Sequence, residues 1–398
     1  MKKKEDFYMS TEILIQNDYH HLSKKGTFAK KDAILSILKE SAISNGIKKS
    51  IDYISTSNCN IEGSNELIEL FKKTNLYKYD YKLPLDNIKY KMYKDNEITL
   101  EFKIQNDDDD TTLTFDAVGH YHFTDDFLDS QFQLKNFANY CRNNNQKELL
   151  DTILEKLLST TKNSTRQYRF IEPRENEILL RGITSTQYKI YDNDLIIYIS
   201  LNALNLYSER TKNKLYIKNA TISDSKMNVS INMKNKYTID KDTKVEVGVR
   251  VHNNEIKEGS FSIEFIYTLI DKDNVKADAI GDKVISIPHR LKAETIKTKL
   301  TEINNLDVFT TDIISAIKAV NTSKKLSDEQ LYKIFNDLSH ATQKLSKNTR
   351  TQINKLDVTN NTLSLIKIFN KLEDIASTVD EKTFIQSKLN EFISTNFR

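Results

Sequence analysis

The chain has 398 residues and a hydrophobic content of 38%, which is enough for two or three domains of about 100–200 residues each. Its formal net charge of +3 excludes a strongly basic body that binds DNA by bulk electrostatics, so any nucleic-acid surface must be local. No apolar run approaches the ~20 residues of a bilayer span, and no apolar stretch follows the N-terminal lysines, so we expect a cytoplasmic protein with no membrane partner.

Residues 1–160 are expected to form an N-terminal region that combines helices with a hairpin. Apolar residues at helical spacing predict helices at residues 31–47, 64–75, 124–141 and 146–160. Alternating apolar and charged residues on both sides of Asp95-Asn96 predict a β-hairpin over residues 88–104, followed by a strand over 111–123. Asp107–Asp110 are interpreted as a solvated turn, because they lack the glycine and the distal glutamate of a calcium loop.

Residues 161–295 are expected to form a β-rich core, and residues 296–398 a helical region. Strand patterns occur at residues 177–183, 214–222, 227–235, 244–255 and 259–271, and one helical stretch occurs at 193–209. The last region contains no proline and has helical periodicity at 325–345, 359–378 and 379–395. The predicted fold class is therefore α+β, with an antiparallel-sheet core and one packed helix between a helical and hairpin N-terminal region and an all-helical C-terminal region.

No constellation of catalytic residues stands out. The motifs GxxxxGK[ST], GxGxxG and GxSxG are absent, and eight glycines leave little for a loop that cradles phosphate. Cys59 and Cys141 match no zinc spacing and cannot form a disulfide scaffold, so both are expected to be reduced and structural. The carboxylates form no pair that spacing singles out. We therefore expect a binding protein that is not an enzyme and has no cofactor.

His120 and His122 lie two residues apart on a predicted strand, so both would project from one face and could share a metal ion. Asp116 has the same parity and could be a third ligand. No other histidine or cysteine is placed near them by spacing. Two half-buried strand histidines are the favoured interpretation, and a metal-dependent nucleic-acid enzyme is an alternative.

Arginine is concentrated in one short segment. Of ten arginines, four lie within sixteen residues, at Arg166, Arg169, Arg174 and Arg181, in a chain that otherwise uses lysine. Guanidinium groups bind phosphate in a bidentate manner and stack on bases, and interleaved aromatic side chains add stacking surface. These features predict a groove for single-stranded nucleic acid. Ion pairs with the nearby glutamates of the same segment, on a solvated sheet face, are the alternative explanation.

The predicted nucleic-acid-binding residues are called the arginine–tyrosine strip: Arg166, Tyr168, Arg169, Arg174, Arg181, Tyr188 and Lys189. The arginines and Lys189 would contact phosphates, and the two tyrosines would stack on bases. This assignment requires the side chains of the strip to face outward.

Three separated segments, residues 124–141, 179–196 and 252–270, resemble in order a mobile-element family described as "phage/plasmid-like protein". The matching positions are Arg181, Ser185, Tyr188, Lys189, Asp192, Asn193, Asn253 or Asn254, Glu255, Gly259 and Ser260. The chain departs from the family at Gln187, where the family has arginine, and at residues 267–274, which replace its "Arg-Leu-x-Cys-x-Asn-Gly" ending. The pattern around Tyr188 is also similar to that of single-strand annealing proteins.

The resemblance implies a gene carried by a bacteriophage or another mobile genetic element. Together with the strip, it leads to the hypothesis of a homo-oligomeric protein that binds single-stranded DNA and anneals strands during recombination or replication. The alternative is a non-enzymatic interaction protein, either a virion component or a factor that binds a host protein.

Overall fold

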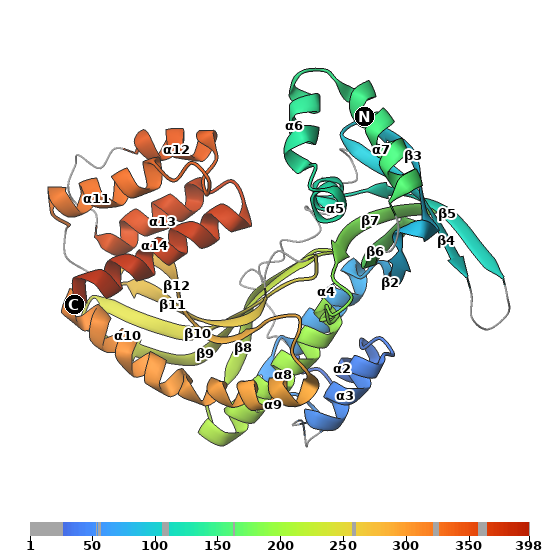
Figure 1. The fold of residues 1–398 in the computed structure, drawn as a ribbon. Coiled ribbons are helices and arrows are strands. Elements are labelled where there is room, and N and C mark those ends of the chain that lie inside the picture. Colours follow the sequence, from blue (N-terminus) through green and yellow to red (C-terminus); the bar gives the residue numbers. More distant parts are fainter. Residues whose placement is uncertain are drawn as a thin grey trace. The chain divides into compact units, whose positions relative to one another are not determined.

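The structure is a computed structural model, and it describes residues 27–52, 54, 57–105, 111–161, 164–256, 260–320, 326–356 and 364–397. These residues form a mixed α+β fold with two six-stranded sheets and a helical C-terminal region (Figure 1). The predicted fold class is confirmed.

The chain divides into two units, and both are discontinuous in sequence. Unit 1 contains the described residues up to Lys73, Asp192–Asn253 and those from Phe261 onward, whereas unit 2 contains Thr74–Tyr191 and Asn254–Ser260. The boundaries predicted after residues 160 and 295 differ from this division. The C-terminal helices belong to the same unit as the sheet that precedes them. Part of the predicted β-rich core pairs instead with strands of the predicted N-terminal region.

The sheet of unit 1 has the strand order β1-β8-β9-β10-β11-β12. Its strands are β1 (Ile61–Glu62), β8 (Leu215–Ile222), β9 (Lys226–Thr238), β10 (Thr243–Asn254), β11 (Phe261–Asp271) and β12 (Lys276–Ile287). The β1–β8 pair is parallel, and the β8–β9, β10–β11 and β11–β12 pairs are antiparallel. The sequence did not reveal β12.

The two faces of this sheet differ in chemistry because side chains alternate along each strand. On β10, Val245, Val247, Val249 and Val251 share one apolar face and are buried. On the same apolar face Phe265 of β11 stacks on Phe309 of α10 (Leu306–Val320), with ring centroids 6.0 Å apart. The opposite face carries polar residues and is called the polar face below.

Helix α8 (Asn193–Thr211) is the central helix of unit 1. It has no polar stripe, and most of its residues are buried, as expected for a helix that is apolar on nearly all sides. The two buried amides Asn202 and Asn205 accept backbone hydrogen bonds, from Ile54 (3.3 Å) and from Asn60 (2.7 Å). These bonds attach the segment before α4 to the helix.

The other helices of unit 1 lie near both ends of the chain: α2 (Lys31–Ser36), α3 (Ala42–Ser50), α4 (Ser64–Thr74), α9 (Ala293–Leu300), η3 (Thr301–Asn305), α10, α11 (Asp328–Ser339), α12 (Lys347–Asn354), α13 (Leu365–Ile375) and α14 (Val379–Phe397). The helix predicted over 31–47 is divided in two because Ser41 caps a new helix, accepting a hydrogen bond from the Ser44 N–H at 3.0 Å. Serine N-caps likewise start α11, α12 and α13.

The sheet of unit 2 has the strand order β2-β6-β7-β5-β4-β3. Its strands are β2 (Tyr77–Pro84), β3 (Ile88–Lys94), β4 (Glu97–Gln105), β5 (Thr112–Gly119), β6 (Thr165–Arg174) and β7 (Glu177–Thr184), and η2 (Leu85–Asn87) joins β2 to β3. The predicted hairpin over 88–104 is confirmed as β3 and β4. Its turn residues Asp95 and Asn96 have φ angles of 55° and 66°, which asparagine and aspartate tolerate better than most residues.

Helices α5 (Phe123–Phe132), α6 (Lys135–Asn143) and α7 (Lys147–Thr160) pack on one face of this sheet. The helix predicted over 124–141 is divided at Gln133, whose left-handed φ of 56° ends α5. Phe102 is at the centre of the aromatic core beneath the helices, and its ring centroid lies 5.4 Å from that of Tyr168 and 5.0 Å from that of Phe170.

Candidate anion-binding pocket

The structure places the arginine–tyrosine strip in unit 2, on β6, on β7 and in the loop that follows β7. Arg169 and Arg181 are buried, at 0% and 1% exposed. Arg169 Nε lies 2.7 Å from Asp80, and Arg181 Nη1 lies 2.5 Å from Glu255. Lys78 also binds Glu255, at 2.8 Å. The expectation that these two arginines face outward is therefore wrong.

The physical reason is that the segment around Glu255 lies over this face of β6 and β7. The Arg169 Nη1 group donates to the backbone carbonyl of Glu255, and a side chain built at Gly182 would lie 3.7 Å from Ile256. The partners of Arg169 and Arg181 are Asp80 and Glu255, which are distant in sequence, whereas Arg174 lies near Glu177 of the same segment, as the alternative explanation expected. Buried guanidinium groups need such carboxylates because an unpaired charge is costly to desolvate.

The expected stacking role is also wrong for Tyr168. This ring is fully buried against Phe102, and its hydroxyl accepts a hydrogen bond from Gln131 at 3.2 Å. Burial raises the pKa of Tyr168 above its ordinary value. Tyr188 is half-buried under the guanidinium of Arg169, and its hydroxyl donates to the Glu255 carbonyl at 3.3 Å.

The three remaining residues of the strip do not lie together on one exposed surface. Arg166 is half-buried and donates to the carbonyl of Ser130 at 3.2 Å. Arg174 is exposed and lies 3.9 Å from Glu177, whereas Lys189 is exposed in the loop after β7. The strip is therefore divided between the aromatic core, a buried ion-paired group around Glu255 and exposed positions, and nucleic-acid binding stays a prediction.

The geometry assumed for a metal site at Asp116, His120 and His122 is absent. Strand β5 ends at Gly119, and Tyr121 has a left-handed φ of 56°, so the alternation of a strand does not apply to the two histidines. Asp116 lies 3.8 Å from Lys91 instead. Within the described ranges, no group of three or more His, Cys, Asp or Glu side chains could hold a metal ion. The turn predicted at Asp107–Asp110 lies outside the described residues.

Cys59 and Cys141 are both buried thiols, which fits the structural roles expected for them. Burial raises the pKa of Cys59 to about 11, so this thiol is protonated at neutral pH and is a poor nucleophile.

A candidate site instead lies on the polar face of the unit 1 sheet. Antiparallel register pairs polar residues across neighbouring strands: Thr221 with Asn228, Asn219 with Ser230, Arg250 with Glu264 and Thr268 with Asp278. The register between β8 and β9 shifts between Ile217 and Asn219. This bulge at Lys218 explains why Lys218 and its neighbour Asn219 both reach the same face.

The polar face is concave. Lys218 Nζ on β8 lies 2.6 Å from Asp278 on β12, although three strands separate β8 from β12 in the sheet order. In a flat sheet these two strands would lie about 19 Å apart, because neighbouring strands are spaced by about 4.8 Å. A lysine and an aspartate side chain cannot span that distance. The sheet therefore curls around its polar face, as the ribbon in Figure 1 shows.

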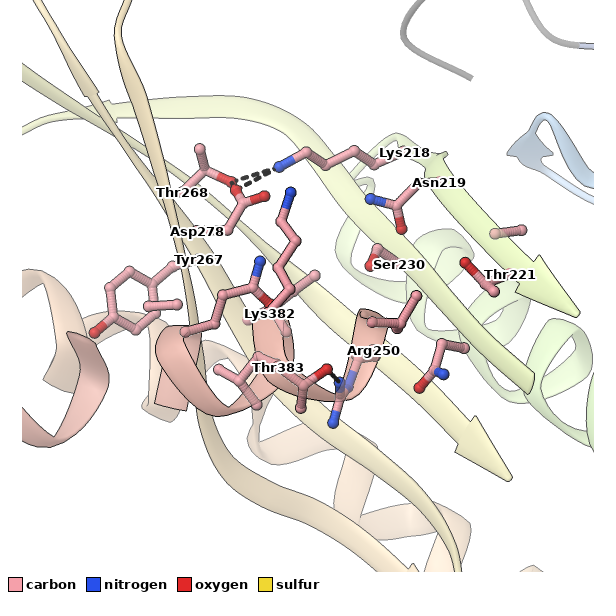
Figure 2. Close-up of a pocket in the computed structure, with 17 residues that line it drawn as sticks. Lys218, Asn219, Thr221, Ser230, Arg250, Tyr267, Thr268, Asp278, Lys382 and Thr383 are labelled. Atoms are coloured by element: carbon pink, nitrogen blue, oxygen red, sulfur yellow. Dashed lines mark hydrogen bonds and ion pairs between the residues drawn. The ribbon is translucent and has the colours of Figure 1, made fainter. Parts of the chain in front are cut away.

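The N-terminal half of α14 lies across this concave face. Arg250 of β10 donates to Thr383 at 2.8 Å, and Lys226 of β9 lies 3.3 Å from Asp380 at the rim. Between the sheet and the helix is a pocket of about 240 Å³ (Figure 2). Besides apolar residues, its lining contains cationic and neutral polar side chains and one carboxylate from β8 to β12 and from α14: Lys218, Asn219, Thr221, Asn228, Ser230, Arg250, Thr268, Asp278, Lys382, Thr383 and Gln386.

Each cation of the pocket is held by a carboxylate. Arg250 donates through Nε and Nη2 to Glu264, at 2.9 and 2.6 Å. Lys218 bonds Asp278 and, at 2.9 Å, Thr268. Burial raises the pKa of Asp278, but its attraction to Lys218 and its hydrogen bonds outweigh burial, so the pKa lies below its ordinary value. Asp278 is therefore ionised at neutral pH.

Lys382 of α14 is the most exposed cation of the pocket, with 48% of its side chain accessible, and it lies 3.6 Å from Glu373 of α13. Glu373 also accepts hydrogen bonds from the Asp278 N–H and from Gln386, both at 2.8 Å. Burial and the charge of Asp278 raise the pKa of Glu373 to about 7. A carboxyl group with this pKa changes charge near neutral pH.

Among the residues that the structure describes, three cations thus line one pocket together with a single carboxylate, Asp278. Cations that are already held in place can bind an anion without a large ordering cost.

Comparisons with protein-family models, with curated proteins and with solved structures return no match. The resemblance to the phage/plasmid-like family stays a prediction. None of the described helices combines the length and the apolar character that a bilayer span requires.

Sequence reasoning did not identify the pocket, because its residues are spread from 218 to 386 and only the curvature of the sheet and the position of α14 bring them together. One local signal was present on β9. The alternate positions Asn228, Ser230 and Asn232 are neutral and polar, whereas a solvated face in a chain with 29% charged residues usually carries lysine and glutamate.

Proposed function

We propose that this protein binds a small anionic ligand in the pocket between the polar face and α14. The observation that carries the proposal is the convergence of Lys218, Arg250 and Lys382 on one cavity. The carboxylates of Glu264 and Glu373 hold two of these cations but are not part of the lining. The cations are therefore positioned before the ligand arrives.

Phosphate is the anionic group that best matches these side chains. Guanidinium donates in a fork that fits phosphate oxygens, and lysine amines contribute point charges. The Thr383 hydroxyl, which already accepts from Arg250, supplies a further donor beside the guanidinium. The phosphate could belong to a free phosphate ester or to the backbone of a single-stranded nucleic acid, which is the partner predicted from the sequence. The small volume of the pocket, about 240 Å³, favours the free ester.

The test is titration calorimetry of the full chain with inorganic phosphate, and fluorescence anisotropy with a labelled single-stranded oligonucleotide across a salt series. Lys382→Gln removes the most exposed cation of the pocket without emptying the core. Lys388→Gln, on the same helix and outside the pocket, is the matched control. Removal of one charge-assisted hydrogen bond is expected to weaken phosphate binding about 10–100-fold in Lys382→Gln, with little change in Lys388→Gln.

The oligonucleotide distinguishes the two sources of phosphate. Binding that falls with salt and is lost in Lys382→Gln would place a nucleic-acid backbone in the pocket. Binding that is unchanged in Lys382→Gln would mean that nucleic acid uses another surface. The proposal fails if the natural sequence binds no phosphate at low salt, or if both lysine variants bind it equally well.

A further inference from the structure

The pocket has two chemically different ends. Figure 2 shows the amines of Lys218 and Lys382 beside Thr268 and Asp278, with Asn219, Ser230 and Thr221 on the other side. The first end is charged, whereas the lining of the second, called the neutral end, is neutral except for Arg250, whose charge is paired with Glu264 outside the lining. A ligand that fills both ends must therefore carry an anionic group at one end and a neutral polar body at the other.

The neutral end is formed by the β8–β9 hairpin. It presents two amides and two hydroxyls in two cross-strand pairs, Asn219 with Ser230 and Thr221 with Asn228. All four side chains are half-buried and line the pocket. Amides and hydroxyls can both donate and accept, which suits the hydroxyl groups of a sugar or polyol because each of those also donates and accepts.

One of these amides is held in a defined orientation. His252 Nδ1 lies 2.8 Å from the Asn228 carbonyl oxygen. Burial and the charge of Arg250 lower the pKa of His252, and because an amide oxygen only accepts, Nδ1 is the donor in this contact. This contact fixes the orientation of the Asn228 amide, whose N–H groups can donate to a ligand.

A nucleobase does not suit this pocket. Proteins that bind unpaired bases commonly stack aromatic side chains on them. The one aromatic residue in the lining is Tyr267, which is 1% exposed and whose hydroxyl is bonded to Asn390 at 3.2 Å. The volume of about 240 Å³ is also below the roughly 300–1,000 Å³ of pockets that hold drug-sized ligands.

We infer that the ligand is a phosphorylated sugar or polyol, with its phosphate at the Lys218–Lys382 end and its hydroxyl groups on the β8–β9 hairpin. This inference rests on the proposed anion-binding function and adds the class of the ligand. It also assigns Asn219, Asn228 and Ser230 a role in specificity that is separate from the role of the cations.

Calorimetric titrations with ribose 5-phosphate, ribose, inorganic phosphate and adenosine 5′-monophosphate test the class. Ribose 5-phosphate is expected to bind at least about ten-fold more tightly than inorganic phosphate or adenosine 5′-monophosphate, and ribose alone is expected to bind weakly. The double variant Asn228→Ala/Ser230→Ala should bind ribose 5-phosphate only as well as inorganic phosphate. Asn235→Ala, an exposed position farther along β9, is the control and should change neither affinity.

The outcomes separate the two proposals. If inorganic phosphate binds and ribose 5-phosphate binds no better, the ligand class is wrong while the anion site stands. If the double variant weakens inorganic phosphate as much as the sugar phosphate, the hairpin has no specific role and the inference is overturned. If adenosine 5′-monophosphate is the tightest ligand, the pocket recognises a base. If none of the phosphorylated probes binds, the proposed function itself is wrong.

Discussion

Glu255 and Arg181 are 74 residues apart in sequence, yet their charged groups lie 2.5 Å apart and neither side chain is exposed to solvent. Lys78 shares the same carboxylate oxygen at 2.8 Å. The pair attaches the segment around Glu255 to β7 of unit 2, where the sequence alone predicted a groove.

The first prediction concerns the stability that this carboxylate provides. Glu255→Gln removes the charge but nearly preserves the shape, so it leaves buried cations without their carboxylate. We expect the free energy of unfolding, measured by denaturant titration, to fall by about 3–5 kcal/mol. Glu177→Gln breaks the exposed contact with Arg174 and should cost less than about 1 kcal/mol. A loss in Glu255→Gln as small as that in Glu177→Gln would show that the ion pairs of Glu255 with Lys78 and Arg181 do not stabilise the fold.

The second prediction concerns the pH dependence of anion binding. Glu373 has a pKa of about 7, and its charge competes with an incoming anion for Lys382. Protonation below pH 7 removes that charge, so affinity should rise as the pH falls. Sulfate is the suitable probe because its charge is constant in this range.

We expect sulfate to bind about 3–10-fold more tightly at pH 6 than at pH 8, which corresponds to about 1 kcal/mol of electrostatic free energy. Glu373→Gln keeps the hydrogen bond to the Asp278 N–H and should bind at pH 8 as the natural sequence does at pH 6. If the affinity of Glu373→Gln for sulfate still differed between pH 6 and pH 8, a titrating group other than Glu373 would be responsible.

The third prediction concerns Asp194, at the start of α8. Burial and the charge of Asp192 raise the pKa of Asp194 to about 6 in the folded chain, above its ordinary value of 3.8. Between pH 4 and 6, Asp194 is therefore more protonated in the folded state than in the unfolded state. The ionised Asp194 carboxylate lowers the free energy of unfolding at pH 7, and this loss is reversed as the pH falls.

Asp194→Asn removes this cost, and its amide oxygen can still accept from the Lys39 N–H, which lies 3.0 Å from the carboxylate. Its stability relative to the natural sequence should be greatest at pH 7. This advantage should shrink by at most about 1.4 kcal/mol per pH unit between pH 6 and pH 4. Thermal unfolding across that range provides the measurement, with the exposed Asp282→Asn as control. If the stability of Asp194→Asn and of Asp282→Asn changed with pH in the same way, the raised pKa of Asp194 would be refuted.

The fourth prediction concerns the approach of β9 to β10 on the polar face. A methyl group added at Gly248 would lie 2.7 Å from the Asn232 Cα and would collide with the Ile231 carbonyl, and neither backbone atom can move alone. Gly248→Ala should therefore lower the free energy of unfolding by about 1–3 kcal/mol or more. Gly281→Ala, where the nearest atoms are 3.4–3.5 Å away, should be tolerated much better. Equal tolerance would mean that the two strands lie farther apart.

Local patterns predicted much of the fold. The alternation on both sides of Asp95-Asn96 predicted the β3–β4 hairpin, and the pattern at residues 244–255 predicted the strand β10, because each depends only on neighbours in sequence. The helices predicted around Ser41 and Gln133 were continuous, since the periodicity of apolar residues does not show where a cap or a left-handed residue ends a helix.

The buried ion pairs and the candidate pocket could not be predicted, because both depend on contacts between residues that are far apart in the sequence. The partners of Arg169 and Arg181 are Asp80 and Glu255, and sequence spacing gives no information about contacts between residues so far apart. Clustered arginines have the same local pattern whether they face solvent or a buried carboxylate. The curvature that brings Lys218 to Asp278 is likewise a property of the whole sheet.

The discontinuous course of the chain has a practical consequence for dissecting this molecule. A fragment cut at residues 74 and 191 would contain Lys78 and Arg181 but would lack the carboxylate that both bind, since Glu255 is contributed by a later stretch of chain. Such a truncated product should misfold or precipitate. Grafting residues 254–260 onto its carboxyl terminus through a flexible linker should recover a soluble fragment for separate study.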